Sequence, residues 1–297
     1  MTEVTKEAKK SRKANLITLD KHMQRFTPKL REILGKDDET RILYINEGLF
    51  IEYPAVKEVF QENLDLFDQP VRPRMVGLLL YSPTNNGKTT LIDRFIKTYA
   101  DKVDGNLIYV ETPERTTLKE FYVETLFKLG YSAKSTRSTG DLRRKILDAL
   151  RHKNVSMIFF DEIHNLLASN RNHKKDILNG LKSLSNRAQI PIVLSGIETA
   201  TKILGEDLQV ADRFFPFELT VWKYDNQFRK LLATFESKFP LKKPSNLHQK
   251  SISKKIWEYC SVLDGARIGR VYELLRRSSI KAIRNGKEAI DKSIIKA

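Results

Sequence analysis

The sequence has a single cysteine, Cys260, among 297 residues. One cysteine excludes an intramolecular disulfide framework and any zinc site that needs several cysteines. Cys260 lies in the mostly apolar stretch 256–263, where a small buried side chain is expected. The sequence also lacks an apolar run of the ~18 residues that cross a membrane, and it begins without the apolar stretch of a signal peptide. These absences predict a cytoplasmic chain without a membrane partner.

Acidic residues are in short supply. The chain has 53 Lys and Arg against 37 Asp and Glu, which gives a formal net charge of +16. From Lys242 to the C-terminus there are fourteen basic residues and five acidic ones, and residues 6–13 form a second basic cluster. A surplus of this size and distribution favours nucleic acid as a partner. The alternative is that the charge serves only solubility.

The most informative segment that is present is 81–90, Tyr-Ser-Pro-Thr-Asn-Asn-Gly-Lys-Thr-Thr, which follows the apolar run 76–80. A buried strand, a turn ending in Gly-Lys-Thr and an amphipathic helix together form a phosphate-binding loop. Lys88 is then expected to contact the β- and γ-phosphates, and Thr89 to ligate Mg²⁺. Ser82 stands where the usual pattern has glycine. The predicted nucleotide contacts are Ser82, Pro83, Thr84, Asn85, Asn86, Gly87, Lys88, Thr89 and Thr90.

A second motif completes this site. The apolar segment 154–160 ends in Asp161-Glu162. An Asp at the carboxyl end of such a strand holds Mg²⁺ in P-loop ATPases, and the adjacent Glu can accept a proton from the attacking water. An acidic pair can also cap a helix. Its position about 70 residues after Lys88, with strands and helices alternating between, favours an ATPase that binds ATP and Mg²⁺.

Hydrophobic patterning predicts an α/β fold with a parallel sheet flanked by helices, followed by a small all-helical lid domain. Strands are expected at 75–81, 106–111, 155–161, 190–195 and 215–219. Helices are expected at 55–67, 90–101, 115–129, 140–152, 173–187, 198–204, 226–239, 249–261, 268–284 and 288–296. The predicted domains are a basic N-terminal tail (1–40) that becomes helical only when bound, a nucleotide-binding domain (41–222) and the lid (223–297).

Five local motifs, in this order, resemble the TniB family of AAA+ ATPases, which serve transposition systems and are related to TnsC. They are the segments 83–89, 161–167, 212–217, 228–236 and 241–245, and the resemblance extends from Arg41 to Gly286. It implies the AAA+ P-loop fold. The family's loop tolerates departures at the position of Ser82.

The resemblance also implies roles for individual residues. Lys88 and Thr89 match the phosphate and magnesium residues, Asp161 the second magnesium ligand and Glu162 the water-activating base. Ser195 matches the sensor that contacts the γ-phosphate or the attacking water. Arg213 matches the arginine finger inserted into the nucleotide of a neighbouring subunit.

Two further expectations concern the nucleotide. Arg267 and Arg270 both match the second sensor of the lid; Arg270 is preferred because Ile268 opens a predicted helix. Tyr53 and Pro54 precede the first helix of the nucleotide-binding domain, where AAA+ proteins bind adenine. Tyr53 is an equally plausible core residue.

An active site completed by a neighbour's Arg213 implies a homo-oligomer, either a ring or a helical filament. In such assemblies, segments after the second strand line the surface that contacts double-stranded DNA without sequence preference. The alternation of basic and hydroxyl side chains here suits phosphate contacts, and the alternative is a solvated loop. The expected DNA-binding residues are Arg115, Thr116, Lys119, Lys134, Thr136 and Arg137.

The resemblance implies a transposition regulator that links a TniQ-like target-selection protein to the transposase and comes apart on ATP hydrolysis. The alternative function is an ATP-driven DNA motor or helicase loader, which shares the same nucleotide motifs. His164, in Asp-Glu-Ile-His, invites comparison with helicases, but those need a second motor domain and only a short helical segment follows residue 222.

Overall fold

The computed structural model describes residues 22–132, 137–263 and 265–295. The chain divides into two compact units: Glu52–Thr220 forms one, and residues before Glu52 join those from Val221 onward in the other. We call them the sheet unit and the helical unit. The expected boundary at residue 41 differs from this division, because residues 38–46 form a helix that packs with the C-terminal segment, whereas the expected boundary at 222 lies within two residues of it.

The sheet unit contains five parallel strands in the order β2-β3-β4-β1-β5. All five strands expected from the sequence are present, with ends that agree within two residues. Their bounds are Gly77–Tyr81 (β1), Asn106–Glu111 (β2), Val155–Asp161 (β3), Ile192–Gly196 (β4) and Phe214–Glu218 (β5). Strand β1, which leads into the Gly-Lys-Thr turn, therefore lies between β4 and β5.

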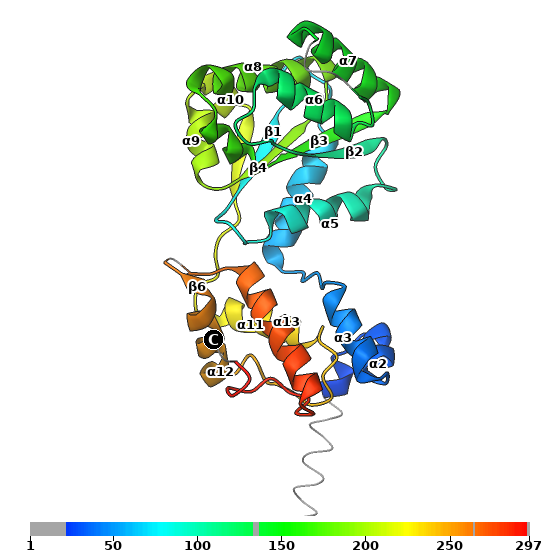
Figure 1. The fold of residues 1–297 in the computed structure, drawn as a ribbon, viewed down its shortest axis with the longest axis vertical. Coiled ribbons are helices and arrows are strands. Elements are labelled where there is room, and N and C mark those ends of the chain that lie inside the picture. Colours follow the sequence, from blue (N-terminus) through cyan, green and yellow to red (C-terminus); the bar gives the residue numbers. More distant parts are fainter. Residues whose placement is uncertain (1–21, 133–136, 264, 296–297) are drawn as a thin grey trace, which may run out of the picture. The chain divides into compact units, whose positions relative to one another are not determined.

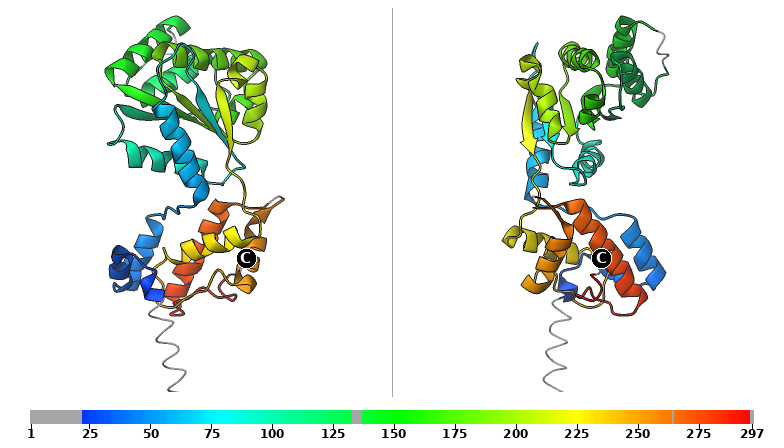
Figure 2. Two further views of the ribbon diagram at one scale, coloured as in Figure 1. Left: turned by 180° about the vertical axis from the view of Figure 1, so that it is seen from behind. Right: turned by 60° about the vertical axis from the view of Figure 1, so that its left-hand side comes forward.

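Helices cover both faces of this sheet (Figures 1 and 2). They are α4 (Pro54–Phe67), α5 (Lys88–Tyr99), α6 (Leu118–Lys128), α7 (Thr139–His152), α8 (Arg171–Ala188), α9 (Thr199–Gly205), α10 (Leu208–Ala211) and the 3₁₀ helix η1 (Ile163–Ala168). Six of them match expected helices; α10 and η1 are too short for their periodicity to be recognised.

Successive residues of the central strands point to opposite faces. Phe159 packs with α4 and α5, whereas Phe160 packs with α6, α7 and α8. In β1, Leu78 belongs to the same apolar cluster as Phe159, and Leu79 belongs to the same cluster as Phe160. This explains why the strands read as continuous apolar runs rather than alternating ones.

The helical unit contains α2 (Pro28–Leu34), α3 (Asp38–Asn46), α11 (Asn226–Glu236), α12 (Lys250–Cys260) and α13 (Ile268–Arg284), with a short hairpin of β6 (Ser261–Val262) and β7 (Gly265–Ala266). The expected tail up to residue 40 is wrong from Pro28 onward. Thr27 and Asp37 cap α2 and α3 through their side chains, a signal that the basic composition of the segment obscured.

The helix expected at 288–296 is also wrong over its described part, 288–295. Gly286 has φ 68° after the end of α13, a left-handed conformation that stops a helix. The Asp291 carboxylate then accepts hydrogen bonds from the backbone N–H groups of Ser293 (2.8 Å) and Ile294 (3.0 Å). The segment therefore forms turns.

Buried ionic groups stabilise the helical unit. The fully buried Arg41 donates to both carboxylate oxygens of Glu288 (2.8 and 2.7 Å) and to the carbonyl of Pro240 (3.0 Å). Glu236 accepts hydrogen bonds from three successive backbone N–H groups, those of residues 245–247, at 2.8–2.9 Å. These contacts fix irregular backbone that has no strand to pair with.

Among the described residues, no helix has the length and hydropathy to span a bilayer.

Candidate nucleotide site

The loop between β1 and α5 has the backbone of a phosphate-binding turn. Asn85 and Gly87 adopt positive φ values of 60° and 90°, and α5 begins directly at Lys88. Asn tolerates this conformation better than most residues, and glycine does so without strain. Ser82 keeps a negative φ, and its backbone N–H donates to the carbonyl of Gly196 at 3.2 Å. A glycine is therefore not needed at position 82.

Lys88 is buried at the start of α5, with 5% of its surface exposed. Its ammonium group donates to the carbonyl oxygens of Ser82 (3.1 Å) and Pro83 (3.2 Å). The cation therefore lies inside the loop and is held by neutral carbonyls. An anion in the loop is a stronger partner for an ammonium than a carbonyl is.

The buried Asn86 fixes the loop to the last strand. Its side-chain amide donates to the carbonyls of Leu219 (2.9 Å) and Thr220 (3.2 Å), just after β5. The position of the loop thus depends on both neighbours of β1, on β4 through Ser82 and on β5 through Asn86.

Thr89 and Asp161 meet at the carboxyl edge of the sheet. The Thr89 hydroxyl donates to Asp161 Oδ2 at 2.6 Å, although the two residues are 72 positions apart. Tyr109 of β2 donates to the same oxygen at 3.2 Å. Burial, together with the Asp161 charge, raises the pKa of Tyr109, so its hydroxyl stays a donor. A hydroxyl and a carboxylate oxygen placed together suit Mg²⁺, with phosphate oxygens and water as the other ligands.

Glu162 has a positive φ of 53°, which is uncommon for Glu and turns the chain sharply after β3. The turn places its half-buried carboxylate 3.0 Å from Nδ1 of His164. Strained backbone of this kind is typical of functional sites. His164 is therefore a neighbour of the candidate base.

Ser195 lies in β4 beside Leu80 of β1, and the residue before it, Leu194, is paired with Phe160 of β3 on the other side of β4. Its hydroxyl is fully buried, and among the described residues it has no hydrogen-bond partner. A buried hydroxyl without a partner is costly unless a ligand or water satisfies it. Its strand is directly adjacent to the strand that carries the loop, as the sensor role requires.

Arg213 lies at the amino ends of the strands, whereas the loop lies at their carboxyl ends. Its backbone carbonyl accepts a hydrogen bond from Gly77, the first residue of β1, at 2.8 Å. The loop begins at the other end of β1, about 13 Å away at ~3.3 Å per residue. The Arg213 guanidinium donates to Asn186 (2.6 Å), and burial, with the nearby Arg74, lowers its pKa. Arg213 thus belongs to a different edge of the sheet from the loop.

The remaining expected nucleotide residues are placed as follows. Tyr53 and Pro54 form the N-cap and first residue of α4, and burial raises the pKa of Tyr53 to about 12. Arg267 is the N-cap of α13, and Arg270 is exposed in its first turn. Both arginines belong to the helical unit, and helix α13 begins at Ile268 as expected.

Of the expected DNA contacts, Arg115 and Lys119 are exposed after β2, and Arg137 is exposed before α7. Thr116 is not available, because it is 1% exposed and its hydroxyl donates to the Thr117 carbonyl. Lys134 and Thr136 lie outside the described residues.

Tyr109 and the anchoring role of Asn86 were missed from the sequence. Tyr109 reaches Asp161 because it is paired with Phe159 in the register of β2 and β3. No local pattern encodes that register, so a Tyr in a predicted strand carried no signal of its own.

A family model, described as "Bacterial TniB protein", matches residues 41–224. No curated protein matches the chain by sequence.

Solved structures with the same fold include the Cdc6p protein of Pyrobaculum aerophilum (TM-score 0.60, 16% identity, covering 80% of this chain and 65% of that one). The Drosophila ORC bound to DNA gives a TM-score of 0.60 at 15% identity, covering 88% and 65% of the two chains. Domain III of the Thermotoga maritima replication initiation protein DnaA gives 0.52 at 14%, covering 83% and 91%. The chain thus has the AAA+ fold and spans slightly less than two thirds of the length of the first two proteins.

Proposed function

The chain belongs to the TniB family, and from this premise we propose that it is an ATP-dependent regulator of DNA transposition in the cytoplasm. In this proposal it assembles on double-stranded DNA, links a TniQ-like target-selection protein to the transposase, and comes apart when ATP is hydrolysed.

The observation that supports the ATP-dependent part of the proposal is the convergence of Lys88, Thr89 and Asp161 at the carboxyl ends of the strands, and the family supports the transposition part. Lys88 exchanges the carbonyls of Ser82 and Pro83 for the β- and γ-phosphates, which bind an ammonium more strongly. Thr89 and Asp161 hold Mg²⁺, which neutralises charge on the phosphates when it is bound. The remaining residues of the turn, 82–87 and Thr90, surround the phosphates with backbone N–H groups.

Glu162 acts as the base in this proposal and Ser195 as the sensor. The carboxylate of Glu162 accepts a proton from the attacking water, and Nδ1 of His164 lies 3.0 Å from it. The Ser195 hydroxyl, which has no partner among the described residues, donates to the γ-phosphate or orients that water. Arg270 remains the proposed second sensor of the helical unit, and Tyr53 with Pro54 the proposed adenine contacts.

The proposed homo-oligomer, a ring or a helical filament, rests on Arg213. It lies at the end of the strands away from its own loop, and this position supports a role at the nucleotide of a neighbouring copy. The side chains of Leu208 and Phe215, close to it in sequence, are 77% and 60% exposed. Large exposed apolar side chains beside a functional Arg suit a surface that another subunit covers.

Electron microscopy of the protein with duplex DNA and a non-hydrolysable ATP analogue tests the proposal. We expect ordered rings or filaments with the analogue and none with Lys88→Ala, which removes the phosphate contact. Glu162→Gln should keep the assemblies after ATP is added, since binding persists without hydrolysis. DNA-dependent assemblies formed equally by Lys88→Ala would contradict the nucleotide switch.

The similarity to replication initiators favours one alternative, a helicase loader or DNA motor. Both functions need the same nucleotide residues, so the test is the downstream reaction. Unwinding, translocation or helicase loading by the purified protein, without stimulation of a transposase, would replace the first proposal with the second.

A further inference from the structure

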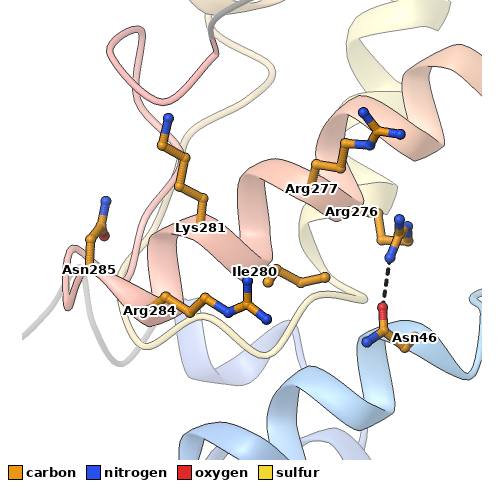
Figure 3. A pocket seen from close by; sticks show the side chains of 7 residues that line it. All are labelled: Asn46, Arg276, Arg277, Ile280, Lys281, Arg284 and Asn285. Carbon is orange, nitrogen blue, oxygen red and sulfur yellow. Dashed lines mark hydrogen bonds between the residues drawn. The ribbon is translucent and has the colours of Figure 1, made fainter.

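A basic groove lies between α3 and α13 of the helical unit. Its volume is about 600 Å³. Figure 3 shows its lining: Asn46, Arg276, Arg277, Ile280, Lys281, Arg284 and Asn285. None of these residues has a role in the nucleotide site described above.

The spacing of residues along α13 creates this groove. Positions 276, 277, 280, 281 and 284 recur at intervals of three and four and so share one face of the helix. The opposite face is apolar and buried, with Val271, Leu275 and Ala282 in the core of the unit. The helix therefore displays the four cations of the groove on the side away from the core of the unit.

The charges on this face do not cancel. Glu273 accepts hydrogen bonds from Arg276 (2.8 Å) and Arg277 (2.5 Å), which hold its pKa at about 2. Asn46 also accepts from Arg276, at 2.6 Å, which fixes that guanidinium at the wall of the groove. Lys281 and Arg284 are exposed and form no ion pair within the described part of the chain. One carboxylate among four cations leaves this face with a net charge of +3.

On helix α7 of the sheet unit, two of the four lysine and arginine side chains have an acidic partner. There Arg144 pairs with Asp141, and Arg151 pairs with Asp148 at 3.1 Å. Each of these cations has an acidic partner one turn earlier. The second half of α13 has no such acid after Glu273, so its excess charge is available to an external anion.

We infer that this groove binds the phosphate backbone of duplex DNA, a contact separate from the expected surface after β2. The inference rests on the proposed function, which brings DNA to the protein. Three of the four cations are arginines, whose planar guanidinium groups bind phosphate through paired hydrogen bonds. The amides of Asn46 and Asn285 add neutral donors at the rim. From Arg276 to Arg284 the helix rises ~12 Å, about the axial rise of three to four nucleotides of one strand.

The test is a salt titration of DNA binding by the full chain, using a short fluorescent duplex of mixed sequence and a non-hydrolysable ATP analogue. We compare Lys281→Glu/Arg284→Glu with Lys230→Glu/Lys254→Glu, an equal charge change at exposed positions on α11 and α12 of the same unit. If both residues contact phosphates, the slope of log K against log salt becomes shallower by about 2 in the groove variant, at ~0.9 per contact. The control variant should keep the wild-type slope.

Thermal melting and binding of the ATP analogue establish that each variant is folded, and Lys281→Gln/Arg284→Gln replaces the reversal if that variant is not. An unchanged slope in the groove variant, while the wild type binds DNA, overturns this inference alone. A failure of the wild type to bind DNA overturns the proposed function as well. If the groove variant loses binding to a poly-glutamate peptide but binds DNA as the wild type does, the groove is assigned to an acidic protein partner. This result likewise overturns the inference.

Discussion

Both units of this protein have an apolar core, but the helical unit adds buried charged contacts between segments distant in sequence. In the sheet unit, the elements are held by apolar side chains on both faces of a parallel sheet, such as Phe159 and Phe160. In the helical unit, buried charged groups join segments that are distant in sequence, as Arg41 does with Glu288 across 247 positions. Regular strands satisfy their own backbone groups, whereas irregular connections need side chains to do so.

The two units also differ in how the hydrogen-bonding capacity of their buried polar groups is used. In the helical unit the carboxylate of Glu236 is buried and fully occupied by backbone N–H groups. At the carboxyl edge of the sheet unit, Lys88 binds loop carbonyls and Ser195 has no partner within the described chain. The proposed nucleotide site therefore lies where the sheet unit has polar groups near its apolar core.

The largest effect should come from breaking the apolar side of this comparison. We expect Phe160→Ala to destabilise the sheet unit by about 3–5 kcal/mol, because the ring is fully buried against Phe121 (centroids 4.9 Å apart) and its loss leaves a cavity. ATP-analogue binding should weaken too, since Asp161 is the next residue. Denaturant unfolding with residue-resolved hydrogen exchange measures the stability of each unit. Phe127→Ala, at a side chain 65% exposed, is the control and should change stability by less than about 0.5 kcal/mol. If Phe160→Ala lowered hydrogen-exchange protection in the helical unit as much as in the sheet unit, the two units would not be stabilised separately.

A smaller loss of stability is expected from breaking the buried ion pair of the helical unit. Arg41→Met leaves Glu288 buried without its main partner and should destabilise the helical unit by about 3 kcal/mol, the lower end for a broken buried pair, because Lys242 remains 3.7 Å away. Burial raises the pKa of Glu288, whereas the hydrogen bonds from Arg41 and from the Lys242 backbone lower it. The lowering is the larger effect, so the pKa lies below its ordinary value. The same hydrogen-exchange measurement applies.

The double variant Arg41→Met/Glu288→Leu is the matched control for this pair. Removing both charges should recover part of the lost stability, since no buried charge is left unpaired. A double variant no more stable than Arg41→Met would show that the pair matters through packing rather than charge.

The smallest effect on stability should come from Ser195→Ala. It removes a hydroxyl that has no partner among the described residues, so unfolding free energy should change by less than about 0.5 kcal/mol. ATP hydrolysis should nevertheless fall by about 10²-fold or more if the hydroxyl acts on the reacting phosphate or water. Steady-state hydrolysis at saturating ATP, set beside the melting curve, separates the two roles. Unchanged turnover would remove Ser195 from the site.

Much of the sheet unit was predictable from the sequence. Strand β3 and its terminal Asp161 were predicted at their observed positions, because a continuous apolar run followed by acids is a local pattern. The loop at Lys88 was predictable for the same reason. Tyr109 and the anchoring of the loop by Asn86 were not, since both depend on which strands are neighbours.

The helical unit was predicted less well. Helix α13 was placed correctly because its apolar stripe is long and regular. The segment before Arg41 was interpreted as a tail, although α2 and α3 fold there, because short helices with weak periodicity are stabilised by packing rather than by local pattern. The expected helix after residue 288 failed where Glu288 turns back toward Arg41.

The sequence by itself determined the chemistry of this protein: a phosphate-binding loop, an acidic pair after a strand, a basic surplus and a resemblance to one family. The loop and the acidic pair are local patterns of neighbouring residues, and the charge surplus is a property of composition, so none of these depends on how the chain folds. Only the tertiary structure decided that Thr89 meets Asp161, that Arg213 lies at the other edge of the sheet, and that the cations of α13 line a groove with α3. Those contacts depend on strand order, register and helix packing, which are set by burial across the whole chain.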